Sequence, residues 1–306
     1  MTSVRANGIT IEYQEFGPPD APPILLIMGL GMQLVAWPDS LCEGLAARGF
    51  RVVRFDNRDV GLSSRMPSPG PLATTAMLTR AVLRLPVRPP YTLDDMARDA
   101  VGLMDALGIA AAHVVGASMG GMIAQILAAQ HPDRVKSLVS IMSSPARLMP
   151  RPKVVRALLK PMPRDREQAI RRMNAFFRLV GGAGYAPTDA ELRAKIERSV
   201  RRSYRPDSFV RHVIAIGAGR SRVAMLRRVR APTLVLHGAD DPLVPPLGGK
   251  MTAAAVPGAR LRIVPGMGHF LPEALVPLLI DEIAAHCLKA GDGAETAALR
   301  RAGGAP

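Results

Sequence analysis

The pentapeptide Gly116-Ala117-Ser118-Met119-Gly120 is the stretch of this sequence best suited to carry chemistry. A serine hydroxyl is a weak nucleophile unless it is held exposed beside a base, and a sharp turn from a strand into a helix holds it in that way. The turn strains the serine backbone, and flanking glycines lack the Cβ atoms that would collide. We therefore predict that Ser118 is a nucleophile and that Gly116 and Gly120 form its elbow. The alternative is an ordinary strand–helix turn that contains a serine.

His269 is the histidine best placed to act as the base for this serine. It lies in the glycine-containing segment 265–270, between the last predicted strand and the last predicted helix. A loop in that position can bring an imidazole over the edge of a sheet. His113 begins a strand and would lie far from Ser118. For His237, which closes a strand, we favour a packing role over support of the site.

Asp241 is the predicted acid that orients this imidazole. Two aspartates, Asp240 and Asp241, follow the predicted strand 233–237, and Pro242 comes next. A proline restricts the preceding residue to extended backbone geometry, which holds Asp241 ready to aim its carboxylate. Asp240 is expected to make turn contacts instead. The loop after the strand that ends at Met142 contains no carboxylate and offers no alternative.

Two backbone N–H groups are needed to stabilise the negative oxygen that forms when a serine attacks a carbonyl. Met119 supplies one, because it directly follows the nucleophile and begins a helix. The loop after the strand 24–28 should supply the other, and we select Leu30. The flanking Gly29 and Gly31 allow the backbone to approach closely, although a plain turn would also use them.

The elements that must position these residues alternate between strands and helices. An antiparallel hairpin is expected around Asn7-Gly8, the favoured two-residue turn. Strands are predicted at 24–28, 51–55, 112–115, 135–142, 233–237 and 261–264, and helices at 40–48, 92–107, 119–130 and 272–288, with a proline-rich loop between 55 and 92. This alternation predicts an α/β fold with a mostly parallel central sheet and helices on both faces.

The interval 145–230 interrupts this alternation and carries the excess positive charge. It contains amphipathic helical patterns at 167–180 and 189–204, separated by proline and glycine. Residues 147–230 hold 22 basic and 6 acidic residues, whereas the rest of the chain holds 18 and 19. We predict a core formed by 1–144 and 231–290 and a basic helical insertion at 145–230. The tail 291–306, rich in alanine and glycine, is predicted to be disordered.

Composition excludes several classes of protein. Aromatic residues make up only 4% of the chain, and with no nucleic-acid-binding motif we expect no nucleic-acid partner. No apolar run reaches the roughly 18 residues that a membrane span needs, and the N-terminus lacks the apolar core of a secretory signal. The two cysteines lack metal-ligand spacing, which favours reduced thiols, a cytoplasmic location and no metal.

The sequence of the basic insertion 145–230 does not determine what this surface binds. A solvated, arginine-rich helical surface is the simplest interpretation. Peripheral contact with an anionic membrane is the alternative that we carry forward, ahead of an acidic partner or an anionic substrate.

Several motifs resemble the α/β-hydrolase superfamily, from about residue 9 to residue 288. Besides the serine elbow, the resemblance is carried by 28–31 (Met-Gly-Leu-Gly), 37–39 (Trp-Pro-Asp) and 55–63 (Phe-Asp-Asn-Arg-Asp-Val-Gly-Leu-Ser). These segments are similar to those of a bacterial esterase branch that includes aclacinomycin methylesterase and related lipase/esterase proteins. Met28 replaces a histidine, and Asp59 a glycine, that are frequent in the wider superfamily, and both replacements look like that branch.

The resemblance implies the α/β-hydrolase fold, with residues 145–230 as a helical cap over the site. It also implies Ser118 as nucleophile, Asp241 as acid and His269 as base, which occur in the order serine, acid, histidine that this superfamily uses. No cofactor is implied.

We therefore expect a cofactor-independent serine hydrolase that cleaves carboxylic esters of hydrophobic small molecules through an acyl-enzyme. The methionines at 28, 32, 119 and 267 would make its pocket apolar and adaptable if they reach it, and would otherwise fill the core. The same three residues could instead serve C–C bond hydrolysis or cofactor-free perhydrolysis. A non-catalytic, ligand-binding protein of this fold is a further alternative, and the oligomeric state is not predicted.

Overall fold

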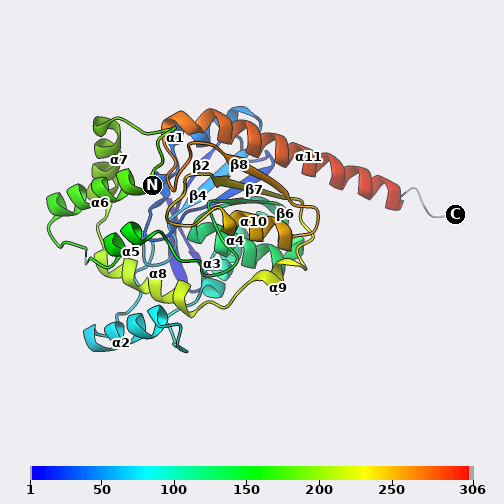
Figure 1. The fold of residues 1–306 in the computed structure, drawn as a ribbon. Coiled ribbons are helices and arrows are strands. Elements are labelled where there is room, and N and C mark those ends of the chain that lie inside the picture. The colour runs from blue at the N-terminus through cyan, green and yellow to red at the C-terminus, as the bar shows by residue number, and fades with distance from the viewer. Residues whose placement is uncertain (1, 161, 303–306) are drawn as a thin grey trace.

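In the computed structural model, which describes residues 2–160 and 162–302, the strands pair into one eight-stranded sheet (Figure 1). Their order is β1-β2-β4-β3-β5-β6-β7-β8. The pairs β1–β2 and β2–β4 are antiparallel and all other neighbours are parallel, which confirms the predicted hairpin and mostly parallel sheet. The strands are β1 (Thr2–Ala6), β2 (Ile9–Phe16), β3 (Pro23–Ile27), β4 (Arg51–Phe55), β5 (Ala112–Ala117), β6 (Val135–Ile141), β7 (Thr233–Gly238) and β8 (Arg260–Val264).

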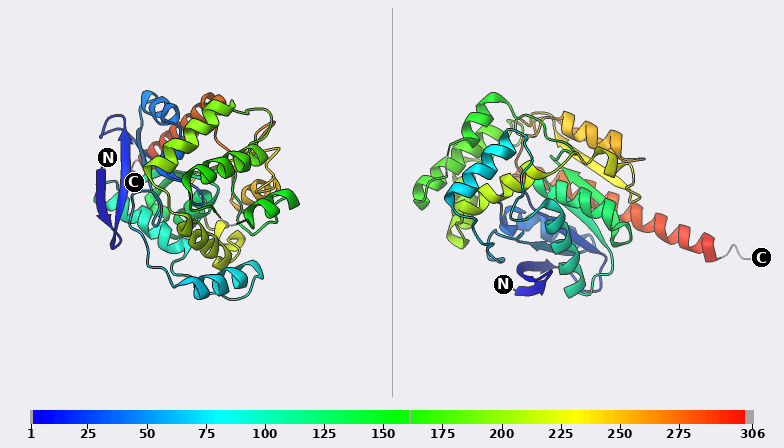
Figure 2. Two further views of the ribbon diagram at one scale, coloured as in Figure 1. Left: turned by 90° about the vertical axis from the view of Figure 1, so that its left-hand side faces the viewer. Right: turned by 90° about the horizontal axis from the view of Figure 1, so that it is seen from below.

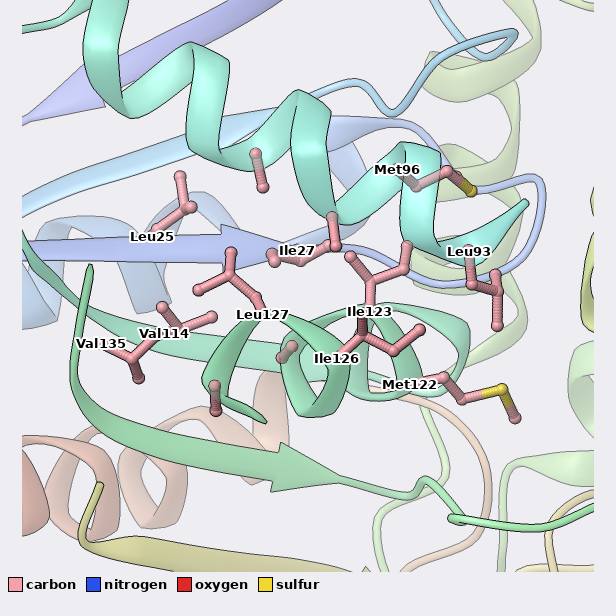
Figure 3. Packing of buried hydrophobic residues seen from close by; sticks show 14 of the residues in the cluster. Leu25, Ile27, Leu93, Met96, Val114, Met122, Ile123, Ile126, Leu127 and Val135 are labelled. Carbon is pink, nitrogen blue, oxygen red and sulfur yellow. The ribbon is translucent and has the colours of Figure 1, made fainter. Parts of the chain in front are cut away.

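Helices cover both faces of the sheet, and the core is split accordingly. Leu25 and Ile27 of β3 join a cluster with α3 and α4, whereas Ile24 and Leu26 join a second cluster with α1 and α11. Figure 3 shows the first cluster, where side chains of β3, β5, α3 and α4 pack together. A strand buried on both faces needs no polar alternation, which explains its continuous apolar run. These helices are α1 (Asp39–Ala47), α3 (Leu93–Ala106), α4 (Met119–Gln130) and α11 (Val276–Ala302).

The interval between β6 and β7 is helical, as predicted. Its first four helices gather on one side of the molecule, away from the far end of α11 (Figure 2), whereas the short last helix packs against α4. Thr188 and Glu191 form a capping box at the start of α7, in which each side chain accepts from the backbone N–H of the other residue. The helices are α5 (Pro152–Leu158), α6 (Arg166–Val180), α7 (Asp189–Arg202), α8 (Pro206–Ala218) and α9 (Val223–Leu226).

The structure differs from the sequence prediction in three segments. Helix α2 (Pro71–Val82) lies within the expected proline-rich loop; Pro71 suits the first turn of a helix, and α2 packs against the distant α8. Helix α10 (Leu247–Ala255) was not predicted. The tail expected to be disordered continues α11 up to Ala302, in line with the high helix propensity of its alanines. Residues 303–306 lie outside the described residues. Short 3-10 helices complete the chain at η1 (Leu34–Ala36), η2 (Pro132–Arg134) and η3 (Glu273–Leu275).

Candidate active site

Ser118 lies at the turn between β5 and α4, and its backbone is strained. Its φ is +56°, in the left-handed region that residues other than glycine avoid. Its N–H donates to the carbonyl oxygen of Ile141 at 2.9 Å. A Cβ on Gly116 would lie 2.3 Å from the carbonyl oxygen of Gly120, and one on Gly120 would lie 2.0 Å from that of Ile27. This elbow therefore has room only for glycine at both positions.

The side chains of Ser118, His269 and Asp241 meet at this turn. His269 Nε2 lies 2.9 Å from Ser118 Oγ, and His269 Nδ1 lies 2.7 Å from Asp241 Oδ2. An ionised carboxylate can only accept, so Nδ1 carries the proton and Nε2 is left to accept from the serine hydroxyl. His269 and Asp241 are buried, whereas Ser118 remains partly accessible. The arrangement can remove the serine proton and stabilise the resulting imidazolium.

The carboxylate of Asp241 is oriented by the backbone of its own loop. Its Oδ1 accepts from the N–H groups of Leu243 at 2.9 Å and Val244 at 2.8 Å, which leaves Oδ2 for His269. The neighbouring Asp240 is exposed. Of the two aspartates, only Asp241 contacts the imidazole.

His237 is fully buried beneath the same loop. Its Nε2 lies 2.8 Å from the carbonyl oxygen of Val244, to which it can donate, and 3.6 Å from Asp241 Oδ2. Burial lowers the pKa of His237 and so disfavours its charged form. His237 therefore packs in the interior, as favoured from the sequence, and it also contacts the loop that carries Asp241.

The loop after β3 lies against the serine. A Cβ on Gly29 would lie 3.0 Å from the Cβ of Ser118. Gly31 has a φ of +66°, and the Gly29 carbonyl accepts a hydrogen bond from the N–H three residues later, which closes a tight turn. Among the described residues, the N–H groups of Leu30 and Met119 donate to no acceptor, so both are available to a ligand.

His212 reaches this loop from α8, a contact that sequence reasoning missed. Its Nδ1 accepts from the N–H of Gly31 at 3.1 Å, and its Nε2 lies 3.1 Å from the carbonyl oxygen of Arg58. Burial lowers the pKa of His212 to about 4. The two partners are 181 positions apart, and no local pattern links them.

Two arginines of the helical segment form buried ion pairs with the loop after β4. Arg211 contacts both carboxylate oxygens of Asp59, and Arg202 Nη1 lies 2.7 Å from Asp56 Oδ2. Burial alone would raise the pKa of Asp59, but its hydrogen bonds, led by those from Arg211, lower that pKa overall. Part of the basic excess of 147–230 is therefore used inside the molecule.

Ser118 and His269 line one cavity of about 480 Å³. Helices α6 and α8 form part of its wall, and aromatic and methionine side chains recur among the lining residues. Among the methionines expected there, Met28 and Met32 line the cavity, whereas Met119 and Met267 are buried in the two cores instead. The aromatic wall residues include Phe176, Phe177, Phe209 and Phe270.

Within residues 2–160 and 162–302, no group of three or more His, Cys, Asp or Glu side chains is arranged to hold a metal ion. No helix of that part of the chain has the length and apolarity needed to cross a membrane. Cys42 and Cys287 are free and buried, and burial raises the pKa of each thiol to about 12. Neither thiol is therefore a ready nucleophile at neutral pH.

A mostly parallel sheet whose central strand ends in a strained, glycine-flanked serine is the mark of the α/β hydrolases. The family model described as alpha/beta hydrolase fold matches residues 22–273, and the chain belongs to this family.

Known relatives place the chain within one branch of that family. Rhodomycin D methylesterase DauP of Streptomyces sp. (strain C5) and rhodomycin D methylesterase DnrP of Streptomyces peucetius are each 31% identical to it, over 92% of this chain and 96% of theirs. This confirms the resemblance to an esterase branch, and the chain is a hydrolase of that branch.

A solved structure shows the same fold. The meta-cleavage product hydrolase from Pseudomonas fluorescens IP01 superposes with a TM-score of 0.73, covering 95% of this chain and 98% of its own. The two sequences are 21% identical, so the likeness concerns the fold alone.

Proposed function

We propose that the protein is a serine esterase that cleaves carboxylic esters of hydrophobic small molecules through an acyl-enzyme. The observation that carries the proposal is the hydrogen-bonded chain Ser118–His269–Asp241 beside an apolar cavity. The two relatives named as methylesterases support the same type of bond cleavage.

Catalysis would begin with attack of Ser118 Oγ on the ester carbonyl carbon as His269 Nε2 takes the hydroxyl proton. The carbonyl oxygen becomes an oxyanion and accepts from the N–H groups of Leu30 and Met119. His269 then returns the proton to the alcohol oxygen, and the alcohol leaves. A water activated by His269 hydrolyses the acyl-serine and restores the enzyme. Asp241 stays ionised throughout, fixes the imidazole tautomer and stabilises its cation.

The cavity favours an ester whose acid part is large and apolar. Aromatic and methionine walls bury such a group well and adapt to its shape. Since the relatives are named as methylesterases, we propose that the leaving alcohol is small. In this scheme the helical segment 145–230 is a cap that completes the cavity, and 1–144 and 231–290 form the catalytic core.

Ester hydrolysis by the wild type and by Ser118→Ala tests the proposal, with p-nitrophenyl esters from acetate to laurate and methyl esters of aromatic acids as substrates. Ser221→Ala, at an exposed position before α9, is the matched control. We expect Ser118→Ala to lower kcat about 10⁴-fold or more, and Ser221→Ala to behave like the wild type. Full turnover by Ser118→Ala, or no turnover of any ester by the wild type, would contradict the proposal.

The same three side chains also suit C–C bond hydrolysis and cofactor-free perhydrolysis. Turnover of a vinylogous diketone, or peracid formation from hydrogen peroxide, without ester hydrolysis would favour those reactions. Stoichiometric labelling of Ser118 by a fluorophosphonate without turnover of any substrate would favour a non-catalytic binding protein.

We also propose that the protein is cytoplasmic and that its basic cap makes peripheral contact with anionic membranes. Besides its arginines, the segment exposes Met149 and Leu159, which are 65% and 70% accessible. Sedimentation with liposomes tests this: anionic lipid should be required, and added salt should weaken binding. Binding that ignores lipid charge would exclude this contact.

A further inference from the structure

The loop that carries the Leu30 N–H is held by α8. The N–H of Gly31 donates to His212 Nδ1 at 3.1 Å. A Cβ on Gly31 would lie 3.0 Å from Cδ2 of Phe209, so the loop backbone touches the surface of α8. The peptide group between Leu30 and Gly31 cannot rotate without breaking the bond to His212. Its orientation in turn restrains the Leu30 N–H, which is one peptide group away.

The imidazole of His212 is itself fixed. The Gly31 N–H must donate, so Nδ1 is the acceptor and Nε2 carries the proton, which it donates to the carbonyl oxygen of Arg58. The ring is 0% exposed and packs edge-on against Tyr91, with ring centroids 6.0 Å apart. Water cannot take over either hydrogen bond without opening this contact.

The residue before His212 anchors the same turn of α8. Arg211 donates to both oxygens of Asp59, and the hydroxyl of Ser208, one turn earlier, donates to Asp59 at 3.2 Å. Two neighbouring residues of α8 thus bind the loop after β4: Arg211 pairs with Asp59, and His212 donates to the carbonyl oxygen of Arg58. Any displacement of α8 from this loop would also move His212 Nδ1, which accepts from the Gly31 N–H.

We infer that His212 is a positioning residue for the oxyanion donor Leu30, so that α8 sets the geometry of the site as well as lining its cavity. The inference rests on the proposed esterase mechanism. It makes the helical segment part of the catalytic apparatus through a side chain that never touches substrate.

Two variants that each keep one of the two hydrogen bonds test this inference. His212→Asn can place an amide oxygen near the position of Nδ1 and accept from Gly31, but cannot reach Arg58. His212→Gln can place an amide N–H near the position of Nε2 and donate to Arg58, but leaves Gly31 without an acceptor. A purely structural role predicts similar losses for both. His131→Gln, at the far end of α4, is the matched control.

For ester hydrolysis, we expect His212→Gln to lower kcat roughly 10- to 100-fold with KM within about threefold, because a displaced oxyanion donor acts on the transition state. His212→Asn should keep kcat within about threefold of the wild type. The rate at which a fluorophosphonate phosphonylates Ser118 should fall by the same factor as kcat. Equal kcat losses in both variants, or a change in KM alone, would overturn the inference.

The phosphonylation rate separates this test from the proposed function. If the wild type hydrolyses no ester, the esterase proposal fails, while the labelling rates of the two variants still report on His212. If the variants do not fold, a measurement on the wild type still tests the contact between His212 and Gly31. In ¹⁵N NMR, His212 should show an unprotonated Nδ1 coupled through the hydrogen bond to the Gly31 nitrogen, and absence of that coupling would refute the contact.

Discussion

Asp59 and Arg211 form a bidentate ion pair with both side chains buried, at 2.5 Å between Nε and Oδ2 and 2.7 Å between Nη2 and Oδ1. Asp59 has a φ of +73°, a conformation that aspartate tolerates better than most residues. The hydroxyl of Tyr91 donates to the same carboxylate at 2.8 Å. Asp59, which replaces a glycine frequent in the wider superfamily, therefore anchors α8 to the loop after β4.

Breaking this pair from one side should destabilise the fold strongly. Arg211→Met leaves a buried carboxylate, and Asp59→Asn leaves a buried guanidinium, so each should lower the free energy of unfolding by roughly 3 kcal/mol or more. The double variant should lose less than the sum, because neither charge is then left alone. Urea unfolding of all four proteins measures the coupling. Additive losses would show that the two side chains do not act as a pair.

Two buried histidines should make stability depend on pH. Burial lowers the pKa of His113 and of His212 to about 4 from an ordinary value of 6.5. Between these values the unfolded chain binds protons that the folded protein excludes, so this stability is complete above pH 6.5 and is lost as the pH falls toward 4. The slope should approach about 1.4 kcal/mol per pH unit for each histidine.

Urea unfolding at a series of pH values measures this slope. His113→Gln should reduce the slope by up to about 1.4 kcal/mol per pH unit. His212 and His237, whose pKa values burial also lowers, should account for slope that remains in this variant. A stability profile that stays flat from neutral pH down to about pH 4.5 would rule out neutral, buried imidazoles.

The local patterns of the sequence predicted what depends on neighbours along the chain. The elbow at Ser118 follows from two glycines, and the choice of Asp241 over Asp240 from Pro242. The two-sided burial of β3 follows from a run of apolar residues. Each signal lies within a few residues of the feature it predicts, because backbone geometry and hydrophobic periodicity are local properties.

Features created by tertiary contact could not be predicted in this way. Helix α2 is not apparent from the sequence because prolines flank it on both sides and its stabilising partner, α8, lies far along the chain. The acceptor role of His212 is not visible in the sequence, because it depends on the positions of Gly31 and Arg58 in space. Met119 and Met267 were candidates for the pocket, but the side on which each side chain falls is decided by packing.

The strained backbone of Ser118 should cost stability that glycine recovers. Ser118→Ala and Ser118→Gly both remove the proposed nucleophile, so both should be inactive on esters. Glycine adopts positive φ readily, whereas alanine retains the strain at +56°. We expect Ser118→Gly to be more stable than Ser118→Ala by about 1 kcal/mol in urea unfolding. Equal stabilities would mean that the turn holds no strain.

Asp241→Asn should disable the site by imposing the wrong histidine tautomer. The N–H groups of Leu243 and Val244 hold the Oδ1 position, so the amide oxygen of the variant takes that place and its NH₂ group faces His269. A donor there forces Nδ1 to accept, which puts the proton on Nε2 and prevents it from receiving the Ser118 proton. We expect kcat for ester hydrolysis to fall about 10⁴-fold.

The matched control is Asp240→Asn, which removes the neighbouring exposed carboxylate. It should keep kcat within about threefold, because the carboxylate of Asp240 makes no hydrogen bond to the imidazole of His269. The loss in Asp241→Asn should also leave the melting temperature nearly unchanged, since the amide keeps both backbone bonds at Oδ1. Equal losses in the two variants would mean that the carboxylates share the role, and the tautomer argument would then fail.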